Sequence, residues 1–200
     1  MNRTLRIALG AAAMQALLVQ AAHAHVGVGH TSGFVHGFGH PFGGLDHVLA
    51  MVMVGVLAAQ IGGRALWLVP AAFLSAMVLG GAVGTLGFDL SFVELGIGLS
   101  VVVLGAVVAL GLRLDMAVAM ALAGVFAMFH GFAHGAEMPA TGSGLGYGAG
   151  FVLATGILHA IGLGSGLALS SGASARGRQV LQAIGGGVAL AGAAIVTGVV

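Results

Sequence analysis

The chain has 200 residues, of which 59% are hydrophobic and only 6% are charged, whereas about 25% of residues are charged in a typical soluble domain. This composition predicts a membrane protein and excludes a charge-rich disordered chain. The absence of cysteine excludes disulfides, thiolate zinc sites and iron–sulfur clusters, and a net charge of +1 gives no basic patch for nucleic acid. Nine histidines stand beside six basic and five acidic residues, which points to metal or proton chemistry.

The first 24 residues are typical of a secretory signal peptide. Two arginines precede an apolar run, and Ala-His-Ala at positions 22–24 fits an A-x-A cleavage site. We therefore predict a signal peptide over residues 1–24 and one membrane domain over residues 25–200. Cleavage would make His25 the N-terminus, where its α-amine and imidazole are candidate metal ligands. The alternative is an uncleaved first span.

Breaking the rest of the chain at its polar and glycine-rich points gives six apolar segments, each near the roughly 20 residues that cross a bilayer as a helix. They cover residues 45–61, 66–86, 90–110, 116–134, 145–169 and 180–200. Their apolar runs are continuous rather than alternating, which argues against a barrel or sandwich. The predicted fold is all-α, a polytopic transmembrane bundle of about six spans.

Arginine placement predicts the orientation of this bundle, because short cytoplasmic loops are enriched in basic residues. The turns after the first, third and fifth segments hold all four arginines of the predicted mature chain: Arg64, Arg113, Arg176 and Arg178. The other turns hold acidic residues and no arginine or lysine. We therefore expect the arginine-bearing turns inside the cell and both termini of the mature chain outside.

The first candidate site has the pattern His-x5-Asp-His, formed by His40, Asp46 and His47 at the entry of the first span. Imidazole nitrogens and carboxylate oxygens suit nickel, cobalt, zinc or copper. Asp46 alone is equally well explained as a helix N-cap, with His47 as an interfacial polar residue. Because His36 and further histidines lie upstream, we favour metal capture.

The second candidate site is the sequence Phe-His-Gly-Phe-Ala-His-Gly-Ala-Glu at positions 129–137. On a helix, its His130, His134 and Glu137 fall on one face and form a polar stripe that leaves the membrane. His130 lies about 21 Å along the helix from the start of its span, in the outer third of the membrane. The alternative is that both histidines only form hydrogen bonds with neighbouring helices.

Two further ionisable residues lie within the predicted spans. His159 is in the middle or inner half of the fifth span, where it supplies a ligand deeper than the two motifs, although a purely structural role explains it equally well when taken alone. Glu94 lies about one turn into the third span, where a carboxylate is costly and is therefore a functional candidate.

Several catalytic and nucleotide-binding motifs are missing from the sequence: H-E-x-x-H, G-x-S-x-G, G-x-G-x-x-G and the P-loop. We therefore expect no enzyme, no organic cofactor and no nucleotide. The expected partners are a divalent metal ion and the lipid bilayer, with a homo-oligomer left open. Two rival functions remain. An intramembrane zinc hydrolase would use the same histidines and carboxylates, and a b-type haem protein would use two histidines.

The His-x5-Asp-His stretch, the F-H-G-x-A-H-G-x-E stretch and the A-H-A-H junction at positions 22–25 together resemble the HupE/UreJ family of nickel permeases, over essentially the whole chain. The resemblance implies a secondary transporter of the bacterial inner membrane, with periplasmic termini, that brings Ni²⁺ into the cytoplasm for urease or hydrogenase maturation. It assigns the family's motif roles to the two histidine-carboxylate stretches. The residues do not select the metal, since Co²⁺, Zn²⁺ and Cu²⁺ bind the same ligands.

The sequence therefore predicts a permease with a ladder of weak metal sites. Outer histidines collect the ion, the two motifs remove its water shell, and His159 passes it inward. Sites with two or three ligands fit transport better than one closed tetrahedral site, because conduction needs release as well as binding.

Overall fold

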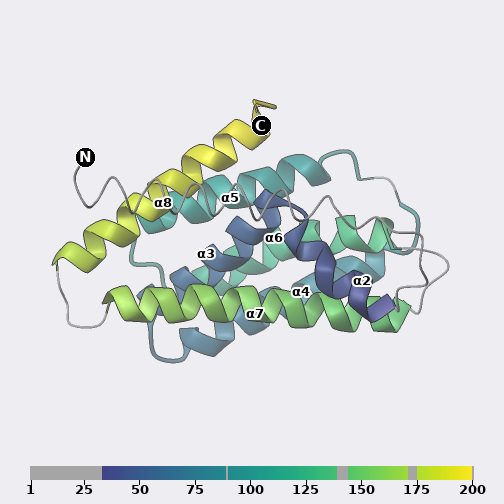
Figure 1. The fold of residues 1–200 in the computed structure, drawn as a ribbon, viewed down its shortest axis with the longest axis horizontal. Helices are drawn as coiled ribbons and strands as arrows, with labels where there is room; N and C mark the ends of the chain where they lie inside the picture. The colour runs from purple at the N-terminus through teal and green to yellow at the C-terminus, as the bar shows by residue number, and fades with distance from the viewer. Residues whose placement is uncertain (1–32, 89, 139–143, 171–174, 200) are drawn as a thin grey trace. The chain divides into compact units, whose positions relative to one another are not determined.

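The computed structural model describes residues 33–88, 90–138, 144–170 and 175–199. Within these ranges the chain forms seven α-helices and one 3₁₀ helix, and it contains no β-strand (Figure 1). The all-α prediction is confirmed. The predicted signal peptide and His25 lie outside the described residues.

The described helices follow the predicted segments in order. They are α2 (Gly33–Gly39), η1 (His40–Phe42), α3 (Leu45–Ile61), α4 (Ala65–Gly84), α5 (Val93–Ala109), α6 (Met116–Ala136), α7 (Gly144–Ser170) and α8 (Ala175–Val196). Each of the six predicted segments corresponds to one helix from α3 to α8. Helix α8 begins at Ala175, five residues before the predicted start of the last segment at residue 180, because its first turn includes Arg176 and Arg178.

The helices differ in how well their length suits a membrane crossing. Four of them, α4, α6, α7 and α8, are long and apolar enough to cross alone. The pair formed by α2–η1 and α3 adds a fifth candidate, bent by 82° at its break, whereas α5 is a shorter apolar helix of 17 residues. The chain is therefore a multi-pass helical membrane protein, and the count of six spans stays a prediction.

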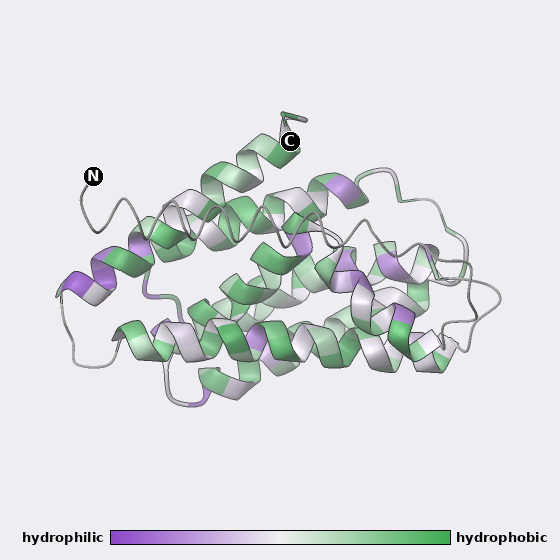
Figure 2. Cartoon of the chain, viewed as in Figure 1, coloured by the Kyte–Doolittle hydropathy of each residue, from purple (hydrophilic) through white to green (hydrophobic). Residues whose placement is uncertain are grey.

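Helix α3 is the central helix of the bundle. It is buried over most of its length and contacts α4, α5, α6, α7 and α8. Its sequence is apolar on all sides, as expected for a helix that is enclosed by others. Figure 2 shows long hydrophobic stretches along the helices, with hydrophilic residues mainly near helix ends and turns.

The bend between η1 and α3 depends on Gly44, which adopts an extended conformation (φ −115°, ψ 128°) as the N-cap of α3. A side chain at Gly44 would meet Asp46 Oδ1 at 2.5 Å and His47 Nδ1 at 2.9 Å. Pro41 is the second residue of η1, near the start of the helix, where its missing N–H is tolerated. The bend lets α2 pack along α7 and leaves the segment around His40 next to the start of α3.

Glycines allow α4 and α6 to pack at close range. In lipid, close van der Waals packing of this kind takes the place of the hydrophobic effect as a source of helix association. A Cβ atom built on Gly84 would collide with the backbone of Phe132 and Ala136, and one built on Gly131 would collide with the backbone of Met77. This contact holds the end of α6, with its histidines, against α4.

We expect Gly84→Ala to lower the free energy of unfolding by about 1–3 kcal/mol, because the new methyl group would force the α4 and α6 backbones apart. Gly156→Ala is the matched control: Gly156 also lies inside a helix, but nothing lies within 4 Å of its added Cβ. Alanine favours a helix by up to about 1 kcal/mol over glycine, so the control should be neutral or slightly stabilising. Unfolding of both variants in the same detergent tests this, and equal stabilities would contradict the packing argument.

Candidate metal centre

The two predicted motifs meet where α3 begins and α6 ends. Asp46 and His47 lie in the first turn of α3, and His40 lies in η1 just before it. His130 and His134 lie in the last two turns of α6, which ends at its C-cap, Glu137. The 3.6-residue helical period explains why the α6 residues share a face, and the bend before α3 brings the first motif to them.

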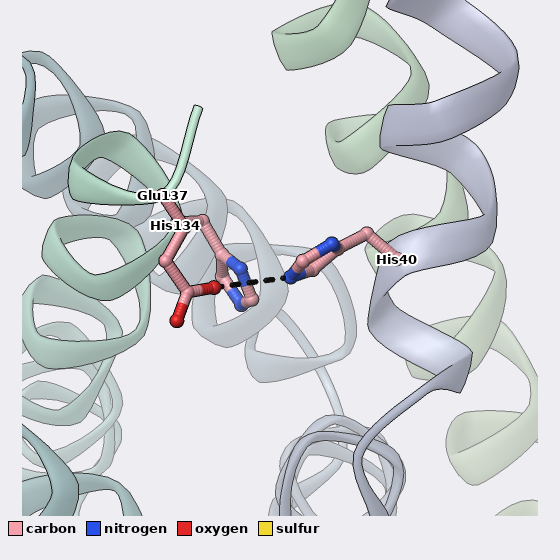
Figure 3. A group of neighbouring side chains, drawn as sticks. All are labelled: His40, His134 and Glu137. Atoms are coloured by element: carbon pink, nitrogen blue, oxygen red, sulfur yellow. Dashed lines mark ion pairs between the residues drawn. The ribbon is translucent and has the colours of Figure 1, made fainter. Parts of the chain in front are cut away.

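The outer part of this centre consists of His40, His134 and Glu137. One ligand atom from each lies within 4.8 Å of the others, and His40 Nε2 is 3.4 Å from Glu137 Oε2 (Figure 3). The neutral imidazole is the form that binds a metal. Two nitrogens and one oxygen in this arrangement suit a divalent transition-metal ion.

Asp46 orients His47 rather than capping the helix. Its Oδ1 accepts hydrogen bonds of 2.8 Å from both the backbone N–H and the ring Nδ1 of His47. Because a carboxylate only accepts, Nδ1 carries the hydrogen and Nε2 keeps its lone pair. That Nε2 atom is buried and has no hydrogen-bond partner among the described residues. A carboxylate that fixes the tautomer in this way is typical of metal-binding histidines.

The buried histidines of α6 also have unpaired ring nitrogens. His130 is 0% exposed and donates a 2.9 Å hydrogen bond from Nδ1 to the Phe126 carbonyl, which leaves Nε2 without a partner in the described part of the chain. His134 is 5% exposed, and both of its ring nitrogens lack partners there. An unsatisfied buried polar group costs about 1–3 kcal/mol, so such a cluster calls for an explanation, and a metal ligand set provides one.

The imidazole rings follow one another into the bundle. Their successive ring centres are 5.9 Å, 4.7 Å, 4.5 Å and 4.9 Å apart. We call this series the histidine file, in the order His36, His40, His134, His47 and His130. It begins at an exposed residue and ends at a fully buried one. The file therefore extends from the surface of the molecule to its interior.

Phe73 of α4 contacts both His130, at the inner end of the file, and His159 of α7. Its ring centre is 5.7 Å from that of His130 and 5.1 Å from that of His159. Phe73 is 0% exposed and His159 is 2% exposed, with both ring nitrogens of His159 unpaired in the described residues. The predicted deeper ligand thus shares one aromatic neighbour, Phe73, with the inner end of the file.

Sequence reasoning missed three aromatic neighbours of the file, Phe73, Tyr147 and Phe151. Phe73 is one apolar residue within a long apolar segment, so nothing in the sequence marks it. Tyr147 is the chain's single tyrosine, its ring lies 5.6 Å from that of His36 and 5.9 Å from that of His40, and its buried hydroxyl has no partner among the described residues.

Glu94 is not brought together with the other predicted ligands. It lies exposed in the first turn of α5. The described part of the chain contains one group of three residues whose ligand atoms lie close enough to hold a metal ion, and Glu94 is not part of it. A ligand role for Glu94 stays a prediction, as does one for His25, which lies outside the described residues.

Comparison with known proteins identifies the family to which these motifs belong. Residues 12–195 match the family model described as HupE / UreJ protein. The chain is also 47% identical over 177 residues to Protein HupE of Rhizobium leguminosarum bv. viciae, a match that covers 88% of this chain and 91% of that relative. The chain belongs to the HupE/UreJ family. The resemblance inferred from the histidine motifs is therefore confirmed, and no solved structure matches this HupE/UreJ chain.

Proposed function

We propose that this HupE/UreJ family member is a permease that carries Ni²⁺, or a similar divalent ion, across the bacterial inner membrane into the cytoplasm. Family membership supports a nickel- or cobalt-transport role. The observation that carries the proposal is the histidine file, which extends from an exposed imidazole to a fully buried one with unpaired nitrogens along it. The ion is the transported substrate, delivered for urease or hydrogenase maturation.

The outer cluster of His40, His134 and Glu137 is the entry site in this proposal. Three ligand atoms within 4.8 Å of one another can replace part of the water shell of a divalent ion and leave other positions to water. The Glu137 side chain is exposed, so it can meet the ion first. Incomplete coordination keeps the site weak enough to release the ion inward.

Transfer then passes from His134 to His47 and His130. Successive ring centres in this part are 4.5 Å and 4.9 Å apart. At this spacing the next Nε2 atom can bind the ion before the previous ligand has fully left it. The carboxylate of Asp46 holds the His47 ring in one orientation and tautomer, so that Nε2 is available to bind the ion.

We propose that Phe73, whose ring contacts both His130 and His159, acts as a barrier in the path. A phenyl ring attracts a cation only weakly and provides no lone pair. The ion would therefore pass when the ring turns aside, and His159 would receive it on the inner side. This arrangement separates capture of the ion from its release.

The proposed direction follows from charge. The four arginines lie at the other end of the bundle, Arg64 and Arg113 between helices and Arg176 and Arg178 in the first turn of α8. The positive-inside rule assigns this end to the cytoplasm. A membrane potential contributes about 2.3 kcal/mol per elementary charge per 100 mV, which favours inward movement of a dication. We also propose that residues 1–24 are a signal peptide that is removed, that residues 25–200 form the transport domain, and that both termini of the mature chain lie in the periplasm.

The rival zinc hydrolase receives no support from the family comparison. A hydrolase needs one compact metal centre with an open position for water. The histidines here are spread along a series of rings that continues past Phe73 to His159. This spread supports a path for an ion rather than one catalytic centre, and we retain the permease.

The separate role of His159 gives a direct test. We expect His159→Ala to lower the maximal rate of Ni²⁺ uptake by about tenfold or more, because losing about 1.4 kcal/mol of stabilisation at one step of the path is a factor of ten in rate. Binding of Ni²⁺ by the outer cluster should be unchanged. Radioactive nickel uptake into cells gives the rate, and calorimetry on the purified protein gives the affinity.

Thr155→Ala is the matched control, since Thr155 is buried in α7 one turn from His159 and lies outside the histidine file. It should preserve both rate and affinity. A normal rate in His159→Ala would remove this residue from the path, and an equal loss in both variants would indicate a packing defect in α7.

A further inference from the structure

A second, chemically different site lies at the end of the bundle opposite the outer cluster. A recess of about 480 Å³ is enclosed by the end of α3, the turn between α5 and α6, the end of α7 and the start of α8. Its polar lining residues are Gln60, Arg113, Ser170, Arg178 and Gln182. No aspartate or glutamate is among the residues that line it.

The two arginines give the recess its charge. Arg113 comes from the α5–α6 turn and Arg178 from the first turn of α8, and neither forms an ion pair within the described ranges. Asp115 lies two residues from Arg113 but is outside the recess. Two positive charges without a carboxylate repel a divalent cation, so the recess has no place in the path of the metal ion.

The donors around the recess match a phosphate group. Guanidinium groups bind phosphate oxygens through paired N–H donors, and amide N–H and hydroxyl groups add single hydrogen bonds. The Oε1 atom of Gln60 is buried and has no hydrogen-bond partner in the described part of the chain, so it can accept a hydrogen bond from a hydroxyl group of the ligand.

The surroundings of the recess favour a lipid headgroup as the source of such a phosphate group. Apolar side chains lie beside the polar ones, among them Ile61, Leu112 and Leu181. The volume falls within the about 300–1,000 Å³ of small-molecule sites and is larger than a lone phosphate requires. Basic pockets between membrane helices on the cytoplasmic side bind anionic headgroups.

We propose that this recess binds the headgroup of an anionic phospholipid, with the phosphate between Arg113 and Arg178 and a headgroup hydroxyl on Gln60. The bound lipid would join the start of α8 to the ends of α3 and α5. Because the donors of the site come from four separate parts of the chain, the lipid also holds these elements together at this end of the bundle.

The test measures binding of short-chain phosphatidylglycerol to the purified full-length protein in an uncharged detergent at physiological salt, by its effect on thermal unfolding. The double variant R113Q/R178Q removes both guanidinium groups of the recess. The matched control R64Q/R176Q removes two exposed arginines from the same end of the bundle that do not line the recess. Phosphatidylcholine and inorganic phosphate are the comparison ligands.

We expect R113Q/R178Q to weaken phosphatidylglycerol binding by about tenfold or more for each arginine removed, because a hydrogen bond to a charged group is worth about a factor of ten. All four arginines are exposed. The control should nevertheless stay within about twofold of the parent protein, because Arg64 and Arg176 do not line the recess and salt screens their more distant charges. Phosphatidylcholine and inorganic phosphate should bind more weakly than phosphatidylglycerol in the parent protein.

Equal weakening in both double variants would overturn the proposal, since the effect would then reflect total charge. Inorganic phosphate that binds as tightly as phosphatidylglycerol would overturn the assignment to a lipid. If R113Q/R178Q fails to fold, R113K/R178K takes its place. This pair keeps the charge but loses the paired donors, and undiminished affinity in it would contradict the proposed phosphate contacts.

Discussion

Replacing His134 by alanine is expected to lower Ni²⁺ uptake by more than about 100-fold, which exceeds the 10- to 100-fold loss typical when only a supporting neighbour of a ligand is removed. His134 belongs to the outer cluster with His40 and Glu137, and its ring centre is 4.5 Å from that of His47. Its removal therefore takes a ligand from the entry site and from the next step together. Radioactive nickel uptake at equal protein abundance in the membrane measures the effect.

A packing role for His134 has to be separated from ligand binding, because its ring centre lies only 4.1 Å from that of Phe151. His134→Leu keeps a side chain of similar bulk but has no ring nitrogen. Both variants should lose uptake and Ni²⁺ binding, and the leucine variant should retain more of the thermal stability. Uptake that survives in His134→Leu would show that the residue only fills space beside Phe151.

Asp46→Asn has the second-largest expected effect, a loss of about 10- to 100-fold in affinity for Ni²⁺. Asparagine can still accept a hydrogen bond from Nδ1 of His47, but the bond to the ionised carboxylate is roughly twice as strong as one to a neutral amide. The His47 ring then becomes a weaker ligand and is less firmly held. Uptake measured over a range of Ni²⁺ concentrations should show a higher apparent KM.

Asp115→Asn is the matched control for this change. Asp115 is an exposed aspartate at the start of α6, at the far end of that helix from the histidine file. It should leave the apparent KM unchanged. If Asp46→Asn behaves like this control, the carboxylate of Asp46 does not support a metal ligand.

The helices were largely predictable because hydrophobic length and helix-ending residues are local properties of the sequence. The predicted segment 45–61 coincides with α3, which has glycine at both caps. The apolar run of the last segment begins only after Arg176 and Arg178, which is why the predicted start, at residue 180, is too late. The helix α8 begins at Ala175, because a helix can extend through charged residues beyond the apolar part of the membrane. The short helix α2 was not predicted, since its glycine-rich sequence carries no apolar period.

The candidate site was predictable only where it lies within one element. The spacing of His130, His134 and Glu137 places them on one helical face without further information. The approach of His40 to Glu137 requires the 82° bend before α3 and the packing of α2 along α7. The contact of Phe73 with both His130 and His159 depends on the packing of three helices that are distant in sequence, and no local pattern encodes such packing.

Transport of Ni²⁺ is tested most directly with the purified protein in liposomes that contain a Ni²⁺-sensitive fluorophore. With Ni²⁺ added outside and an inside-negative potential, we expect the parent protein to quench the trapped fluorophore and His134→Ala liposomes to behave like protein-free ones. Quenching in His134→Ala at the parent rate, or no quenching by a parent protein that binds Ni²⁺, would contradict an ion path along the histidine file.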